Sequence, residues 1–193
     1  DLMQEHLDDL AELETLDQGK NLRTSRFGEV PAAINQFRYY AGWPTKIFGQ
    51  TIPTSVSRTP AGKELFAYTR REPVGVVGAI VPWNSPLIMT AMKLAPALAA
   101  GCTIVLKPAE NTPLTAAFLG RLLQRAGVPD GVVNIISGYG AEAGQALVEH
   151  PDVAKVAFTG STAVGKRLVQ TASTDLTRLT LELGGKSPSL ILP

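Results

Sequence analysis

Residues 74–81 read VGVVGAIV, an unbroken apolar run with the length of a strand. Three more apolar runs follow it, at 102–106 (CTIVL), 132–136 (VVNII) and 153–158 (VAKVAF). Strands that crossover helices bury on both faces have such continuous apolar runs, whereas half-exposed strands alternate. The four runs therefore predict the inner strands of a parallel sheet.

Helical segments separate the apolar runs. Gly101 ends the first segment, and the second has Pro113 in its first turn and ends at Gly127. Two further strands are expected, at 176–183 (LTRLTLEL) and 189–192 (SLIL). This alternation predicts an α/β fold with a doubly wound, Rossmann-like, mostly parallel sheet. The expected helices are 87–100, 112–126, 141–149 and 162–173.

The region before the sheet divides into two parts. In residues 1–47 leucines recur at helical spacing, which predicts an N-terminal helical segment. Residues 48–72 are rich in Thr, Ser, Gly and Pro and contain the strand-like FAYTRRE, so they predict a hairpin that leaves the main body. Residues 73–193 then form the sheet domain.

Composition excludes several classes of protein. The chain has 193 residues, 45% of them apolar, and a net charge of +1, which excludes a disordered chain and gives no sign of nucleic-acid binding. The single cysteine, Cys102, excludes an internal disulfide, and the two histidines are too far apart for a histidine-rich metal site. The apolar stretch 87–106 contains Lys93 near its middle, and a lysine at mid-bilayer costs about 3 kcal/mol. We therefore expect a cytoplasmic protein with no metal and no membrane span.

The candidate site lies where the strands end. Ligands of doubly wound sheets bind at the carboxyl ends of the strands. Taken singly, each segment there has an ordinary explanation, because glycines form turns and charges such as Lys107 and Glu110 are solvated in loops. Five such segments at one edge indicate a binding site. They contribute Pro82, Trp83, Asn84, Lys107, Pro108, Ala109, Glu110, Ser137, Gly138, Tyr139, Gly140, Gly144, Thr159, Gly160, Ser161, Glu182, Leu183 and Gly184.

A dinucleotide is the ligand that these residue types favour. A glycine turn at Gly160 lets the main chain approach a pyrophosphate, and the helix that follows offers free N–H groups beside the Ser161 hydroxyl. Glu110 can accept hydrogen bonds from ribose hydroxyls and would repel a 2′-phosphate, which favours NAD over NADP. The glycines do not follow the G-x-G-x-x-G spacing, so this is not the standard fingerprint.

Residues 160–166 (GSTAVGK) also fit the P-loop pattern G-x-x-x-x-G-K between a strand and a helix. The next residue of a P-loop is Ser or Thr, which holds Mg²⁺, but Arg167 stands there. The missing metal ligand argues against a phosphotransferase and leaves this interpretation as a minor alternative.

Five long motifs resemble the aldehyde dehydrogenase superfamily. They are PWNSP (82–86), LKPAENTPLTA (106–116), GVPDGVVNIISGYG (127–140), VAFTGSTAVGK (156–166) and LTLELGGKSP (179–188). The similarity begins at about Glu14, with ETLDQGK, and continues to the end of the chain. Members of that family are more than twice as long, so the resemblance implies an internal piece that covers most of the cofactor-binding domain and lacks the catalytic domain.

The resemblance also implies roles for individual residues. Glu182 matches the family's general base, and Asn84 matches the asparagine whose side chain stabilises the oxyanion. Lys107 and Glu110 match the ligands of the adenosine ribose, and Val164 matches a residue that packs on the adenine. Cleft and turn positions complete the implied cofactor site, with Ile80, Val81, Pro82, Trp83, Pro108, Ala109, Gly140, Gly144, Phe158, Thr159, Gly160, Ser161, Leu183 and Gly184.

The implied activity is oxidation of an aldehyde to a carboxylic acid through a cysteine thiohemiacetal and thioester, with NAD as cofactor and NADP as a possible substitute. The nucleophilic cysteine of the family lies beyond Glu182, past the end of this chain, and Cys102 in a buried strand is no substitute. The segment 48–72 resembles the family's oligomerisation hairpin, which implies a homodimer or homotetramer. The motifs lean towards aromatic or betaine-type aldehydes. A non-catalytic nucleotide-binding module and an acyl-transferring semialdehyde dehydrogenase remain the alternatives.

Overall fold

The structure is a computed structural model, and it describes residues 1–191 except 57, 58 and 61. Its centre is a five-stranded sheet in the order β5-β4-β3-β6-β7. All four pairs of neighbouring strands run parallel, which confirms the doubly wound α/β fold. The strands are β3 (Val76–Ile80), β4 (Thr103–Lys107), β5 (Val133–Ile135), β6 (Val153–Gly160) and β7 (Arg178–Leu183).

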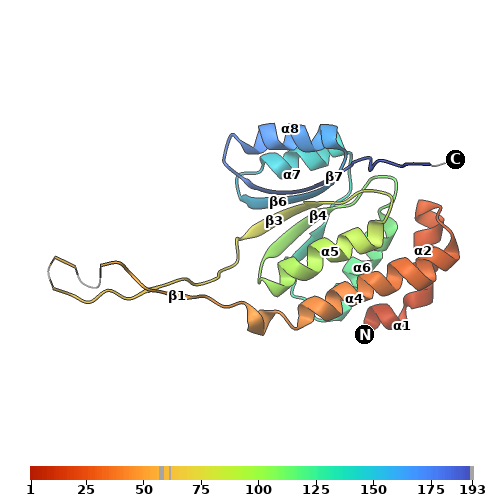
Figure 1. Ribbon diagram of the computed structural model, residues 1–193. Helices are drawn as coiled ribbons and strands as arrows, with labels where there is room; N and C mark the ends of the chain where they lie inside the picture. The colour runs from red at the N-terminus through yellow and green to blue at the C-terminus, as the bar shows by residue number, and fades with distance from the viewer. Residues whose placement is uncertain (57–58, 61, 192–193) are drawn as a thin grey trace.

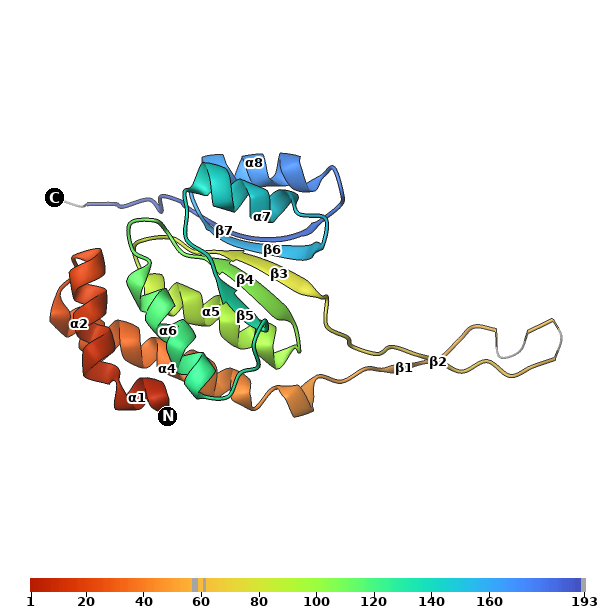
Figure 2. The same ribbon diagram turned by 180° about the vertical axis from the view of Figure 1, so that it is seen from behind.

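Helices cover both faces of the sheet (Figures 1 and 2). One face carries α5 (Pro86–Ala99) and α6 (Leu114–Arg125), and the other carries α7 (Gln145–Glu149) and α8 (Thr162–Ala172). The π-helical turn η3 (Gly140–Gly144) leads directly into α7. Each helix follows a strand and returns the chain to the amino edge, so every strand ends at the same carboxyl edge.

The N-terminal helices form an outer layer on the face of α5 and α6 (Figure 2). Helix α4 packs against α5, and α2 packs against α6. Gly19 ends α2 in the left-handed conformation, with φ of +86°. The helical elements of this layer are α1 (Leu2–Glu5), α2 (Leu7–Gln18), α3 (Leu22–Thr24), the π-helical turn η1 (Ser25–Glu29), α4 (Val30–Ala41) and the 3₁₀ turn η2 (Pro44–Lys46).

Two apolar clusters hold the layers together. The larger lies beneath α5 and α6 and includes Leu87, Leu94 and Leu106, all fully buried. The smaller lies beneath α7 and α8 and includes Val156 and Leu168. Complete burial of one such side chain stabilises the fold by about 2 kcal/mol, so these clusters fix the sheet on which the candidate site is built.

A long arm leaves the body between η2 and the sheet (Figures 1 and 2). Its strands β1 (Thr51–Ile52) and β2 (Ala67–Tyr68) pair antiparallel, so residues 48–72 contain the expected hairpin pairing. Ile52, Phe66 and Tyr68 are exposed on it. Residues 57, 58 and 61 of this expected hairpin lie outside the described residues.

The strand expected at 189–192 is not formed. Residues 189–191 belong to no strand, and residue 192 lies outside the described residues. The segment leaves the end of β7 and runs away from the sheet (Figure 1), with Leu190 and Ile191 exposed. An apolar run becomes a strand only where another strand offers main-chain hydrogen bonds, and among the described residues nothing pairs with it.

Of the helices that the structure describes, none is long and apolar enough to span a bilayer.

Candidate functional site

The predicted site residues gather at the carboxyl edge of the sheet. Ile80 at the end of β3 is in register with Lys107 on one side and Phe158 on the other. Gly160 at the end of β6 is in register with Leu183 of β7. The segments that follow these strands therefore leave the sheet side by side, as the sequence predicts.

A buried lysine fixes a carboxylate at this edge. Lys107, the last residue of β4, is 2% exposed, and its Nζ donates a hydrogen bond of 2.8 Å to Oε2 of Glu110. That hydrogen bond lowers the pKa of the Glu110 carboxyl, so the group is ionised at neutral pH. The Glu110 side chain remains 42% exposed. It can therefore accept hydrogen bonds from an external hydroxyl pair while Lys107 holds it in place.

The amino end of α8 follows directly on β6. The Ser161 side chain caps this helix by accepting a hydrogen bond of 3.3 Å from the main-chain N–H of Val164. The first N–H groups of a helix have no partner within it, so those of α8 can bind an anion. The sequence predicts that the Ser161 hydroxyl also binds the anion. In the structure its oxygen accepts the capping hydrogen bond, and its hydrogen can still be donated to a ligand.

Glycine is required at two turns of the edge. A Cβ on Gly160 would lie 2.4 Å from the ring of Phe158, a distance at which the two groups collide. Gly138 has φ of +147°, and its Cβ would lie 2.7 Å from Cβ of Ala143. Gly144 is buried, and a Cβ there would lie 3.7 Å from Cδ1 of Ile80, so the turn before α7 touches the end of β3. At Gly160 and Gly138 the main chain thus packs more closely against neighbouring side chains than a Cβ would permit.

The turn between β3 and α5 presents Asn84 to solvent. Val81 is buried and donates from its main-chain N–H to the carbonyl of Lys107, at 3.2 Å. Trp83 is 56% exposed, and Asn84 is exposed as well. Within the described residues the Asn84 side chain makes no hydrogen bond, whereas its main-chain carbonyl accepts one from Lys20, at 3.1 Å. The amide group of Asn84 is therefore available to a ligand.

Glu182 lies on the exposed face of β7, opposite the side packed by α8. It lines a hollow of about 350 Å³ beside α5, together with Lys93, Lys155 and Cys102. Strands β3 and β7 both border β6, which places them about 10 Å apart. Asn84 follows β3 and Glu182 lies near the end of β7, so the two residues belong to the same edge of the sheet, and Asn84 does not line the hollow.

The structure also places Cys102 and Val164, for which the sequence makes specific predictions. Cys102 is 5% exposed and precedes β4 at the amino edge, so it packs as an apolar residue. Val164 is half-buried against the apolar cluster beneath α7 and α8. None of the predicted site residues lies at the amino ends of the strands.

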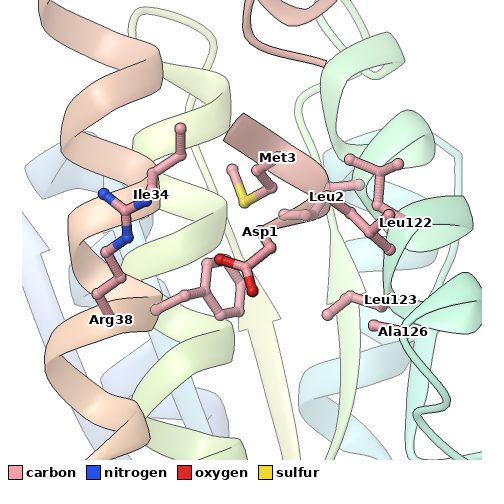
Figure 3. A pocket seen from close by; sticks show the side chains of 10 residues that line it. Asp1, Leu2, Met3, Ile34, Arg38, Leu122, Leu123 and Ala126 are labelled. Carbon is pink, nitrogen blue, oxygen red and sulfur yellow. The ribbon is translucent and has the colours of Figure 1, made fainter. Parts of the chain in front are cut away.

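One further pocket, of about 370 Å³, lies between α1, α4 and α6 (Figure 3). Leu2, Met3, Ile34 and Leu122 make its wall mostly apolar. None of the predicted site residues lines it. It therefore has no part in the arrangement at the carboxyl edge.

Comparison with known protein families identifies the family of this chain. The model of the aldehyde dehydrogenase family matches residues 1–193. The chain belongs to the aldehyde dehydrogenase family. The similarity thus begins at residue 1, before Glu14, where the sequence motifs place its start. Membership also leaves no support for the P-loop interpretation of residues 160–166.

Relatives of known sequence and structure agree with this family. The aldehyde dehydrogenase of Enchytraeus buchholzi is 55% identical over the whole chain, and the phenylacetaldehyde dehydrogenase of Pseudomonas fluorescens is 53% identical. A solved NAD⁺ complex of an aldehyde dehydrogenase from Bacillus cereus superimposes on the whole chain with a TM-score of 0.92 at 52% identity. In each case the chain spans 38% of the relative's length.

The structure of this aldehyde dehydrogenase chain adds functional candidates that sequence reasoning missed. Lys93 shares the hollow with Glu182, and burial lowers the pKa of its ammonium group while the charge of Glu182 opposes that shift. Its sequence signal, a lysine inside an apolar helix, counted only as evidence against a membrane span. Lys20, Glu14 and Glu29 lie behind the Asn84 turn, and nothing in their local sequence links them to it.

Proposed function

We propose that this chain is the cofactor-binding part of an NAD-dependent aldehyde dehydrogenase, which oxidises an aldehyde to a carboxylic acid. In this proposal the chain supplies the cofactor site, Asn84 and Glu182, and a cysteine outside it forms the thiohemiacetal and thioester. The observation that carries the proposal is the ionised Glu110, held by buried Lys107 at the carboxyl edge of the sheet, the edge at which α8 also begins. The NAD⁺ complex of the Bacillus cereus relative supports the same cofactor.

The residues at the edge fit a dinucleotide. Glu110 would accept hydrogen bonds from the two hydroxyls of a ribose, and its negative charge would disfavour a 2′-phosphate. The free N–H groups of α8 would bind the pyrophosphate. The bound nicotinamide would supply the hydride acceptor. NAD is therefore the proposed cofactor, with NADP as the weaker one.

Asn84 and Glu182 would carry out two separate steps. The side-chain N–H of Asn84 donates to the oxygen that becomes negative when a thiolate attacks the aldehyde carbonyl, and one such donor contributes about 100- to 1000-fold in rate. Glu182 takes a proton from the water that hydrolyses the thioester, as a general base. Its place in an open hollow beside α5 supports this role, because water reaches it there.

The arm formed by residues 48–72 would join subunits of a homo-oligomer. Its pairing leaves Ile52, Phe66 and Tyr68 exposed far from the body of this chain (Figure 2). Apolar side chains exposed in this way indicate an interaction surface. For the substrate, the 53% identity to phenylacetaldehyde dehydrogenase favours an aromatic aldehyde over a betaine aldehyde.

Stopped-flow measurement of NADH in the full-length protein tests the proposal. Glu182→Gln should give a burst of about one NADH per site and then stop, because the thioester forms but is not hydrolysed. Asn84→Ala should slow the burst itself by about 100-fold, with NAD binding unchanged.

Two outcomes would contradict the proposal in different ways. NAD binding without aldehyde-dependent NADH formation in the wild type would favour the alternative, a non-catalytic nucleotide-binding module. Steady turnover by Glu182→Gln when CoA or phosphate is added, at the wild-type rate, would favour an acyl-transferring enzyme.

A further inference from the structure

The turn that carries Asn84 is attached to a charged cluster in the N-terminal helices. The Nζ of Lys20 lies 3.2 Å from Oε1 of Glu14, 3.2 Å from Oε1 of Glu29 and 3.1 Å from the carbonyl oxygen of Asn84. The Glu14 side chain is 0% exposed, that of Lys20 is 11% exposed and that of Glu29 is 17% exposed. One ammonium group therefore joins a buried carboxylate and a half-buried one to the main chain of the proposed oxyanion donor.

Separate elements bring the cluster together. Glu14 belongs to α2, Lys20 follows Gly19 at the end of that helix, and Glu29 is the last residue of η1. A π-helical turn such as η1 inserts an extra residue into a helix, and such turns are frequent at functional sites. A hydrogen bond of 2.9 Å between the hydroxyls of Thr15 and Ser25 holds α2 against η1. Glu29 therefore lies at the end of an irregular turn that this hydrogen bond ties to α2.

The cluster is poorly explained as a source of stability. Burial raises the pKa of the Glu14 carboxyl, Lys20 and the Thr115 hydroxyl oppose this shift without cancelling it, and the charge of Glu29 adds to it. Among the described residues, one carboxylate oxygen of Glu29 is buried without a hydrogen-bond partner. Replacing a buried charged cluster by apolar side chains is often neutral or stabilising. The arrangement therefore suits a positioning role better than a purely stabilising one.

The turn is held at two successive residues. Lys20 holds the carbonyl of Asn84, and the hydroxyl of Ser85 donates to Oε1 of Glu29 at 3.0 Å. A fixed carbonyl at Asn84 fixes the peptide plane that follows it, and this limits the directions open to the Asn84 side chain. We propose that Lys20 is a positioning residue for Asn84, because it anchors this turn to the carboxylates of Glu14 and Glu29. The inference rests on the proposed function, in which Asn84 stabilises the oxyanion.

A double-mutant cycle in the full-length protein tests this inference. The variant Lys20→Met alone leaves the fully buried Glu14 carboxylate without a counter-charge, so the cycle uses Glu14→Gln together with Lys20→Met. This double variant removes both charges of that pair at constant size and leaves only the partly exposed Glu29 carboxylate unpaired by Lys20. This pair of substitutions should slow the first-turnover rate of NADH formation about tenfold, since small misplacements of a catalytic group are costly. The Kd for NAD and the KM for aldehyde should change less than about twofold.

The same pair of substitutions should have almost no effect when Asn84 is already alanine. A change below about twofold in that background is expected, because a positioning residue acts only through the group that it positions. Ser85→Ala, which leaves the charges in place, should slow the first turnover about threefold with Asn84 present and not in its absence.

A control removes an exposed ion pair from the same helices without touching the turn. Arg26 lies 2.8 Å from Asp8, between η1 and α2, and Arg26→Met should leave the first-turnover rate unchanged. Equal slowing in both Asn84 backgrounds would overturn the positioning role and assign the cluster to folding alone. If Asn84→Ala itself does not slow the first turnover, the proposed role of Asn84 fails, and the inference fails with it. That result differs from equal slowing in both Asn84 backgrounds, which would contradict the inference alone.

Discussion

Two lysine–glutamate pairs lie near the carboxyl edge of the sheet, and they are opposite in burial. At the end of β4 the lysine is buried, since Lys107 is 2% exposed, whereas its partner Glu110 is 42% exposed. Behind the Asn84 turn the carboxylate is the buried member, since Glu14 is 0% exposed and Lys20 is 11% exposed. The N–O distances are similar, at 2.8 Å and 3.2 Å.

The same chemistry has opposite consequences in the two pairs. The pKa of Glu110 is lowered, because the hydrogen bond from Lys107 acts on a carboxyl that water still reaches. The pKa of Glu14 is raised, because the loss of water outweighs the attraction of Lys20. An exposed carboxylate with a fixed partner can serve a ligand, while a buried one can only serve the fold or hold a neighbour.

The largest expected difference between the pairs is in stability. Lys20→Met leaves the Glu14 carboxylate buried and unpaired, which should lower the free energy of unfolding by about 3 kcal/mol. Lys107→Met keeps a buried apolar stem and leaves a hydrated Glu110, so it should lower that free energy by less than about 1 kcal/mol. Urea unfolding of the full-length protein measures both.

Adding Glu14→Gln provides the control for this difference. A neutral amide needs no counter-charge, so the substitution should restore most of the stability lost in Lys20→Met. Equal losses in Lys20→Met and Lys107→Met would show that burial of the carboxylate does not distinguish the pairs.

The sequence places Lys107 and Glu110 at the candidate site and gives no sign of Lys20 and Glu14 there, and the reason is physical. Lys107 and Glu110 directly follow an apolar run, and strand ends mark the binding edge of a parallel sheet wherever the fold is known. Lys20 acquires its role through a contact with Asn84, which is 64 positions away. Helical periodicity places Lys20 near the end of a helix but carries no information about which turn that end meets.

The fold itself was predictable for the same reason. The strands β3, β4, β5 and β6 are continuous apolar runs, and each one forms at its expected place. The run at 189–191 is also largely apolar, but no strand of the described part of the chain pairs with it, and it is exposed. An apolar composition indicates that a segment can be buried, whereas a strand also requires a neighbouring strand with which it forms main-chain hydrogen bonds.

An intermediate effect is expected on cofactor choice. Glu110→Gln removes the negative charge that faces the ribose in the proposed site, so it should weaken NAD binding and relieve the repulsion of a 2′-phosphate, changing the ratio of the two affinities about tenfold in favour of NADP. Glu14→Gln removes a carboxylate that no ligand reaches, so the ratio should stay the same. Titration calorimetry with NAD and NADP measures this, and an equal change in both variants would contradict the assignment of Glu110 to the cofactor.

The smallest expected effect is on the pH dependence of stability, and its sign differs between the pairs. Lowering the pKa of Glu110 below its ordinary value of 4.5 stabilises the fold above that value, and this contribution is lost as the pH falls through the lowered pKa. Raising the pKa of Glu14 favours the fold while the carboxyl is protonated, and this contribution is lost as the pH rises through the raised pKa.

Urea midpoints of the two glutamine variants, relative to the wild type, make this difference in sign measurable. As the pH rises from about 3, Glu110→Gln should become less stable than the wild type, and the change should be small because Glu110 is partly hydrated. Glu14→Gln should gain on the wild type over the pH range above 4.5, where the wild type must ionise a buried carboxyl. If the stability differences of the two variants change with pH in the same way, Lys20 compensates Glu14 as fully as Lys107 compensates Glu110. The burial of Glu14 would then have no electrostatic cost, and no positioning role would be needed to explain it.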